Sequence, residues 1–468
     1  MKKIIGLAAI VAYAAAFITV IALTTRVDDH AVPPESFAGK IAVATLFSLT
    51  AIVTYILTRT DAADLSQKKM PFWIPAAIVS AFLIGISLSF QPLGSADGVW
   101  NAFMGRVIAV HGANPYLSAP QDFPNDPVSH LVAPIWASTR MVYGPLWTML
   151  AAGVAYLVPN FSRSIIALRF VNVACYIIAG CILHAAYRKK KWTAHAQLAD
   201  RSSLTADTLL AIWLMNVAAI FETANNGHNE GVLILALAVA VVGMLWDAVD
   251  IALCGITAAV LVKLWPAILF PALLGMVRKE PRKAARAAVL CAAAIFVCTL
   301  PFGGPIIVFG NAAPILAATN LPFFSPIRYA VFLAVAYAGA SGTTALAAAM
   351  AVAILSTAAI LITVARASWK KILTPQLACL ALATMYFGVT SPWLLPWHII
   401  ALLPFVLFIK EIPISTAALI ALFLSMLGFT MYAVPAGLIF IVMLVLGLTI
   451  ASTKYFKIKS SLLPKPEG

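Results

Sequence analysis

The side chain best suited to acid–base chemistry is Asp97, which closely follows an apolar run over residues 72–90. That run approaches the length of a membrane span, so we expect the carboxylate at the boundary between membrane and water. Partial desolvation there raises the pKa of a carboxyl group toward values useful for a general base. Aspartate also favours helix N-termini, so an acidic cap on the helix that follows is the alternative interpretation.

A second polar cluster runs from Glu222 to Glu230 between two apolar stretches, and seven of its nine side chains can form hydrogen bonds. A simple connector between membrane helices needs far fewer, because unsatisfied polar groups at that depth are expensive. His228, Asn229 and Glu230 are therefore predicted to belong to a wall that binds sugar or phosphate. The spacing of His228 and the two glutamates matches no standard ligand set, so no metal site is predicted.

Four cationic or titratable side chains are candidates to bind a phosphate group: Arg140, Arg169, Lys263 and His398. Guanidinium and ammonium groups are the usual partners of phosphate in proteins. Lys263 interrupts a long apolar run beside Pro266, which predicts a tight helical hairpin over 250–276 with the lysine near its tip. Snorkelling of Lys263 to the outer head groups is the alternative.

Aromatic side chains accompany these groups. Trp100, Trp136 and Tyr143 fall in the segment after Asp97, and Trp397 directly precedes His398. Such rings can stack on a sugar or contact a polyprenyl chain. An aromatic belt at the membrane interface is the alternative interpretation.

The composition indicates what positions these residues. Of the 468 residues, 62% are hydrophobic and 10% are charged, and the mean hydropathy is +0.97. Soluble domains carry about 25% charged residues, so the chain is predicted to be an all-α polytopic membrane protein. The net charge of +14 could indicate a nucleic-acid partner, but basic residues in membrane proteins usually gather in cytoplasmic loops. We therefore predict no nucleic-acid partner.

About 12–14 spans are predicted, with external juxtamembrane helices. Besides the hairpin, the candidate spans are 4–24, 40–58, 72–90, 164–187, 207–221, 229–246, 286–302, 344–366, 371–391, 394–409, 412–430 and 434–451. Segments 145–158 and 328–341 are predicted not to cross fully, because most of the 31 Lys and Arg residues then lie on the cytoplasmic side.

Under this topology the candidate residues all lie on the external face. One membrane domain over 1–451 is predicted, with a long external loop at 91–144 that carries Asp97, followed by a cytoplasmic tail at 452–468. A helix over 99–110 is expected to lie along the membrane surface with one apolar face.

Short motifs in a shared order resemble the GT-C superfamily of membrane glycosyltransferases, and within it the bacterial polyprenol-phosphate-mannose-dependent α-mannosyltransferases. The resemblance covers roughly residues 72–410. It is carried by Asp97, Gly105-Arg106-Val107, Gly112-Ala113-Asn114-Pro115-Tyr116, Pro134-Ile135-Trp136, Tyr143-Gly144-Pro145-Leu146, Gly227-His228-Asn229-Glu230, Val262-Lys263-Leu264-Trp265-Pro266 and Pro396-Trp397-His398.

The resemblance implies an enzyme that transfers a hexose, with mannose expected, from polyprenyl phosphate to a cell-envelope glycan or glycolipid. Asp97 would be the general base for inverting attack, and no cofactor or essential metal is implied. The enzyme would sit in the plasma membrane with its site on the extracytoplasmic face. A transporter or flippase of a lipid-linked sugar, and a membrane scaffold without activity, are the alternatives; mid-span ionisable groups and an inverted repeat would favour transport.

Overall fold

The computed structural model describes residues 73–89, 92, 95–191, 206–311, 325–391 and 394–408, and every regular element in them is helical. The predicted all-α fold is confirmed. The candidate spans at 4–24, 40–58, 412–430 and 434–451 and the tail at 452–468 lie outside the described residues.

Three of the described helices are long and apolar enough to cross a membrane: α8 (Phe161–Lys191), α14 (Pro281–Thr299) together with η5 (Leu300–Phe302), and α18 (Gly342–Trp369). A fourth candidate is bent by 46° between α9 (Ala206–Leu214) and the continuous turns of α10 (Val217–Ile220) and η3 (Phe221–Asn225). These helices, with the hydropathy of the chain, make it a polytopic membrane protein.

The remaining elements are shorter. They are α4 (Trp73–Ser89), α5 (Asp97–Ala109), η1 (Pro120–Asp122), η2 (Ser129–Leu131), α6 (Pro134–Ala137), α7 (Pro145–Leu157), α11 (Glu230–Leu245), α12 (Val249–Val260), η4 (Trp265–Leu273), α13 (Leu274–Lys279), α15 (Pro305–Gly310), α17 (Pro326–Tyr337), α19 (Pro375–Met385), η7 (Tyr386–Thr390), η8 (Pro396–Leu402) and α20 (Leu403–Leu407).

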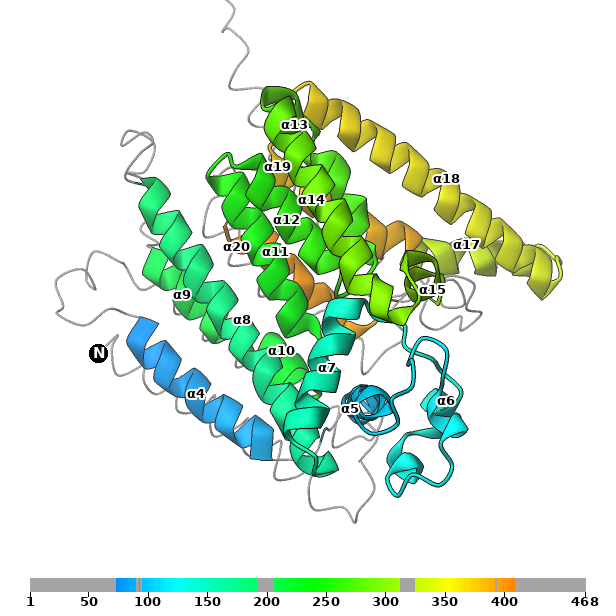
Figure 1. Ribbon diagram of the computed structural model, residues 1–468. Coiled ribbons are helices and arrows are strands. Elements are labelled where there is room, and N and C mark those ends of the chain that lie inside the picture. Colours follow the sequence, from blue (N-terminus) through cyan, green and yellow to red (C-terminus); the bar gives the residue numbers. More distant parts are fainter. Residues whose placement is uncertain are drawn as a thin grey trace, which may run out of the picture.

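The centre of the fold is α11, which packs against α8 on one side and α12 on the other (Figure 1). Glycines allow this close approach. A methyl group on Gly231 would clash with the backbone of Asn172 in α8, and one on Gly255 would clash with Ala240 across the α11–α12 pair. Small residues at helix crossings are the usual means by which membrane helices approach closely.

The apolar stretch 250–276 folds as the predicted hairpin. Helix α12 ends at Val260, the chain turns through Lys263, and it returns as the 3-10 segment η4, whose second residue is Pro266. Proline lacks an amide hydrogen and is tolerated at the start of a helical segment, so it fixes where the second arm begins.

Helix α5 is more extensively buried than a helix with a single apolar face. It begins at Asp97 and packs against α7 and α8, so that Trp100, Asn101 and Phe103 are all buried. A single apolar face was expected over 99–110, whereas contacts with two helices bury α5 on more than one side. Helix α7 has 13 residues, about 20 Å, which is short for a span; whether 145–158 and 328–341 cross the membrane stays a prediction.

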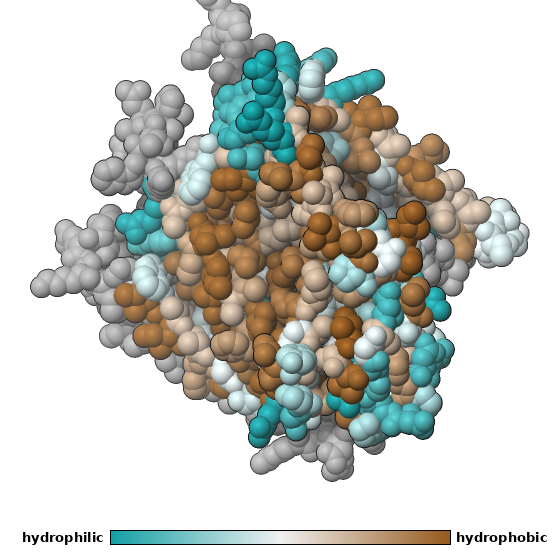
Figure 2. Space-filling model, in the orientation of Figure 1, coloured by the Kyte–Doolittle hydropathy of each residue, from teal (hydrophilic) through white to brown (hydrophobic). Residues whose placement is uncertain are grey.

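The two ends of the α11–α12 pair differ in chemistry. Glu230 and Lys263 lie at one end, whereas Asp250 at the other end pairs with Lys283, 3.2 Å from carboxylate to ammonium. Figure 2 shows a hydrophobic band between a hydrophilic end near α13 and a second hydrophilic region over α6. The basic segment 278–286 and the candidate residues therefore lie at opposite ends of a helix pair about 24 Å long.

Candidate active site

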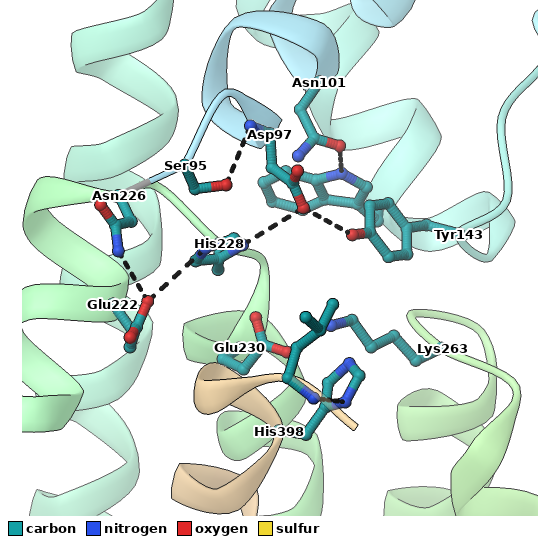
Figure 3. Close-up of polar contacts among 12 residues, drawn as sticks. Ser95, Asp97, Asn101, Tyr143, Glu222, Asn226, His228, Glu230, Lys263 and His398 are labelled. Carbon is teal, nitrogen blue, oxygen red and sulfur yellow. Dashed lines mark hydrogen bonds and ion pairs between the residues drawn. The ribbon is translucent and has the colours of Figure 1, made fainter. Parts of the chain in front are cut away.

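Asp97 occupies the first turn of α5, and its side chain is buried (Figure 3). Its backbone N–H donates to the Ser95 hydroxyl at 3.1 Å. One carboxylate oxygen, Oδ2, accepts a hydrogen bond from the Tyr143 hydroxyl at 3.3 Å and lies 3.4 Å from Nδ1 of His228. The residue at the N-cap position is Ala96, so Asp97 is not the helix cap, although its charge is favourable at this helix end.

The pKa of Asp97 moves in the direction opposite to the one expected. Burial raises the pKa of the carboxyl group, but contact with His228, the charges of His228 and Lys263, and a hydrogen bond with Ser95 together hold it below its usual value of 3.8. The expectation from the sequence counted desolvation alone and was wrong, because the cations around the carboxylate come from other segments. Asp97 is therefore ionised at neutral pH and able to accept a proton.

His228 lies between two carboxylates. Its Nε2 is 3.5 Å from Oε2 of Glu222, on the side away from Asp97, and Glu222 also accepts a hydrogen bond from the Asn226 amide at 2.9 Å. The imidazole stacks on Trp397 with ring centres 3.7 Å apart and planes 19° from parallel. The ring is thus fixed in position by an aromatic face and by an acid at each edge.

The local sequence explains how His228 reaches this place. The π-helical turn η3 ends at Asn225, and Gly227 then adopts φ +74°, a conformation that residues with side chains rarely take. A side chain at Gly227 would also clash with Arg169. Helix α11 starts at Glu230. One helical segment therefore ends and the next begins within the polar cluster, and the side chains of the cluster face the interior of the fold.

Lys263, at the tip of the hairpin, forms a buried ion pair with Glu230. Its ammonium also lies 5.0 Å from the centre of the Tyr143 ring, a cation–π contact. Burial raises the pKa of Tyr143, and the nearby charges of Asp97 and Glu230 raise it further. Tyr143 therefore keeps its proton and acts as a hydrogen-bond donor to Asp97.

Several buried polar atoms near these groups have no hydrogen-bond partner among the described residues. They include both side-chain amide atoms of Asn229, Oε2 of Glu230 and Nδ2 of Asn101, whose Oδ1 accepts from the Trp147 indole at 2.8 Å. Buried polar groups in proteins are normally paired, so unpaired ones mark a place where polar groups of a ligand can bind.

Arg169 and Arg140 occupy very different places. Arg169 is buried in α8 and donates from Nε to the Ala224 carbonyl at 2.7 Å and from Nη2 to the Ser87 carbonyl. It thus joins α4 and the turn before His228 to α8. Arg140 is exposed in the segment between α6 and α7 and makes no hydrogen bond or ion pair with the residues that the structure describes.

His398 lies on η8 beside Trp397. Its ring stacks on Phe387 at 5.8 Å between centres, and its Nδ1 accepts a hydrogen bond from the Leu395 N–H at 3.3 Å. Of the sequence candidates, the structure therefore brings together Asp97, Tyr143, His228, Glu230 and Lys263, with Trp397 stacked on the histidine and His398 next to it. Within the described ranges, no group of three His, Cys, Asp or Glu side chains is arranged to hold a metal ion.

Glu222 and Asn101 are site residues that were not among the candidates. Glu222 belongs to the predicted polar cluster, but a nine-residue segment with seven polar side chains does not reveal which of them face inward. Asn101 is one helical turn after Asp97, and this i, i+4 spacing on one face was the available signal.

Comparison with known proteins identifies one family. Residues 4–279, more than half of the chain, match the family described as alpha-(1->6)-mannopyranosyltransferase, N-terminal domain. No curated protein and no solved structure matches the chain. The matched range includes Asp97, Tyr143, the Glu222–Glu230 cluster and Lys263, and it ends before Trp397 and His398.

Proposed function

Since the chain belongs to the alpha-(1->6)-mannopyranosyltransferase family of membrane glycosyltransferases, we propose that it transfers mannose from a polyprenyl-phosphate donor to a cell-envelope glycan or glycolipid. The observation that carries the proposal is the buried, ionised Asp97, held by Tyr143 and His228. A glycosyl transfer needs a base for the attacking hydroxyl and charge stabilisation for the leaving group.

The proposed reaction is an inverting displacement. Asp97 takes the proton of the acceptor hydroxyl as the oxygen attacks the anomeric carbon, and the bond from that carbon to the phosphate oxygen breaks. Both contacts described for the carboxylate involve Oδ2, and in our proposal Oδ1 receives the proton. Tyr143, which retains its proton, orients the carboxylate throughout.

The sugar is proposed to bind to the unpaired polar groups of Asn229, Glu230 and Asn101. A hexose carries several hydroxyl groups that both donate and accept hydrogen bonds, and these match an amide with both atoms unpaired beside a free carboxylate oxygen. A buried donor or acceptor without a partner costs about 1–3 kcal/mol, so pairing it contributes to binding the sugar.

The leaving phosphate is proposed to bind Lys263, with His398 and Arg140 as further partners. The Lys263 ammonium has three N–H donors, and Glu230 occupies only one of them in the ion pair. Arg169 already donates to two carbonyl oxygens, so in this proposal it supports the turn before His228 and does not touch the donor.

We place the site on the extracytoplasmic face of the plasma membrane. Three basic segments support this orientation: 188–191 at the far end of α8, 278–286 beside α13, and 366–371 at the end of α18. The last two are joined by a hydrogen bond from Arg278 to the Trp369 carbonyl at 3.0 Å. Basic loops favour the cytoplasm, and these lie at the end of the helices away from Asp97.

The experiment that tests the function supplies membranes containing the protein with labelled polyprenyl-phosphate-mannose or with a labelled nucleotide-mannose, and measures label in glycan and glycolipid. We expect transfer only from the lipid donor. Transfer from the nucleotide sugar, or from neither donor, would contradict the proposal. Orientation is tested with an impermeant thiol reagent in a chain lacking its natural cysteines: Gln121→Cys should react from outside and Arg282→Cys should not, both positions being exposed.

A further inference from the structure

We propose that Glu222 is a positioning residue that works through His228, so that Asp97, His228 and Glu222 form one proton-accepting unit. The inference rests on the proposed mannosyl transfer. It assigns a role in that reaction to a carboxylate that does not touch either substrate.

The geometry is an unbroken line of polar atoms. Oδ2 of Asp97 is 3.4 Å from Nδ1 of His228, and Nε2 of the same ring is 3.5 Å from Oε2 of Glu222 (Figure 3). All three side chains are buried, so water does not compete for these contacts. The separations are a few tenths of an ångström longer than hydrogen bonds, as is common for catalytic contacts before substrate binds.

Two further contacts restrict the unit. The stacked Trp397 ring opposes rotation of the imidazole about its Cβ–Cγ bond, and the Asn226 amide fixes the Glu222 carboxylate through its 2.9 Å hydrogen bond. The ring therefore keeps one nitrogen toward each acid. Both ring nitrogens carry hydrogen in this unit: Nδ1–H faces Oδ2 of Asp97, and Nε2–H faces Oε2 of Glu222.

The proton balance of the step is simple. The O–H bond of the acceptor breaks, its electron pair forms the new bond to the anomeric carbon, and Asp97 receives the proton. The proton stays on Oδ1 of Asp97 during the displacement, while the imidazolium ion of His228 donates from Nδ1 to Oδ2 and is held at Nε2 by the charge of Glu222. The phosphate released from the donor is the base that finally takes the proton, because the broken bond leaves it with an additional negative charge.

The other charged or titratable groups around the ring do not supply this role. Glu230 on α11 is paired with Lys263 of the hairpin tip, Arg169 on α8 donates to backbone carbonyls, Tyr143 keeps its proton, and His398 on η8 accepts from a backbone N–H. Among the described residues, Glu222 is the carboxylate that contacts Nε2.

The test compares Glu222→Gln with wild type in the mannosyl-transfer assay across pH. The glutamine keeps size and hydrogen bonding but removes the charge that stabilises the imidazolium. We expect kcat to fall about 10–100-fold while KM for polyprenyl-phosphate-mannose changes less than about threefold. The acidic limb of the pH–kcat/KM profile should move to higher pH by about one unit, because a less basic imidazole holds Asp97 in its ionised form less effectively.

Asn226→Ala provides an independent second variant. It removes a hydrogen bond that stabilises the Glu222 carboxylate, so Glu222 takes up a proton and loses its charge at a higher pH. The acidic limb should therefore move in the same direction as with Glu222→Gln. A residue that served packing alone would lower both kcat and the amount of folded protein without moving the limb.

A matched control is Asp207→Asn, which breaks another His–carboxylate contact, 2.8 Å from His184, near the far end of α8. It should leave kcat and the pH profile unchanged. If the wild type is active and the pH profiles of Glu222→Gln and Asn226→Ala superimpose on its profile, the inference is wrong and the proposed function still stands. If the wild type does not transfer mannose, the proposed function itself is contradicted.

Discussion

The buried pair of Glu230 and Lys263 allows a quantitative prediction about stability. Both side chains are almost completely shielded from solvent: the relative exposure is 0% for Glu230 and 5% for Lys263. At an effective dielectric constant of about 20, unit charges about 3 Å apart attract by about 5 kcal/mol. Removing one partner leaves the other charge buried and alone, which costs about 3–5 kcal/mol of folding free energy.

We expect Lys263→Met and Glu230→Gln each to lose about that amount, with Lys263→Met also losing the cation–π contact to Tyr143. The double variant carries no unpaired charge and should lose only about 1–2 kcal/mol, since replacing a whole buried ion pair is often close to neutral. The coupling free energy in the double-mutant cycle is therefore about 4 kcal/mol or more.

The assay is equilibrium unfolding in mixed detergent micelles, followed by tryptophan fluorescence, with mannosyl transfer measured on the same samples. The double variant should recover stability without recovering transfer, because it lacks the ammonium proposed to bind phosphate. Additive losses, within about 0.5 kcal/mol, would refute the reasoning that the two charges are held as a buried pair.

Two other variants distinguish residues that bind substrate from residues that stabilise the fold. Asn229→Ala should lower kcat/KM about 10–100-fold without lowering the unfolding free energy, because the amide it removes is buried and unpaired. A matching fall in stability would contradict a sugar-binding role. Arg169→Met should lower stability by about 2–4 kcal/mol, because the Ala224 carbonyl loses the Arg169 donor and the Ser87 carbonyl keeps only the Asn225 amide, while kcat per folded molecule changes little. A large rise in KM for the donor at full stability would instead indicate phosphate binding.

Much of the architecture follows from sequence because the signals are local. A lysine beside Pro266 in an apolar run predicts a hairpin tip, and the structure has one there. The sequence also singles out the acidic residue after the 72–90 run and the polar cluster that leads into α11, and the structure places Asp97 3.4 Å from His228. Each of these predictions needed only composition, spacing and the cost of burying polar groups.

Properties that depend on partners distant in sequence were not predictable. The pKa of Asp97 is lowered by groups from the Glu222–Glu230 cluster and the hairpin, more than 100 residues away, and no local pattern reports that contact. In the same way, Arg169 was predicted from its type to bind phosphate, but type alone does not reveal that two backbone carbonyls already accept its hydrogen bonds. The inward orientation of Glu222 depends on the π-helical turn, which has no sequence signature here.

The central claim is tested most directly by the rate of mannosyl transfer by Asp97→Asn at saturating polyprenyl-phosphate-mannose. Asparagine preserves shape but cannot accept the proton, and the account predicts a fall in kcat of about 1,000-fold, within the range that general-base catalysis contributes. The matched control is Asp122→Asn in the segment that follows α5, where the exposed carboxylate accepts a hydrogen bond from the Ala119 N–H. That control should transfer mannose at the wild-type rate. An Asp97→Asn variant that turns over as fast as this control would contradict the account.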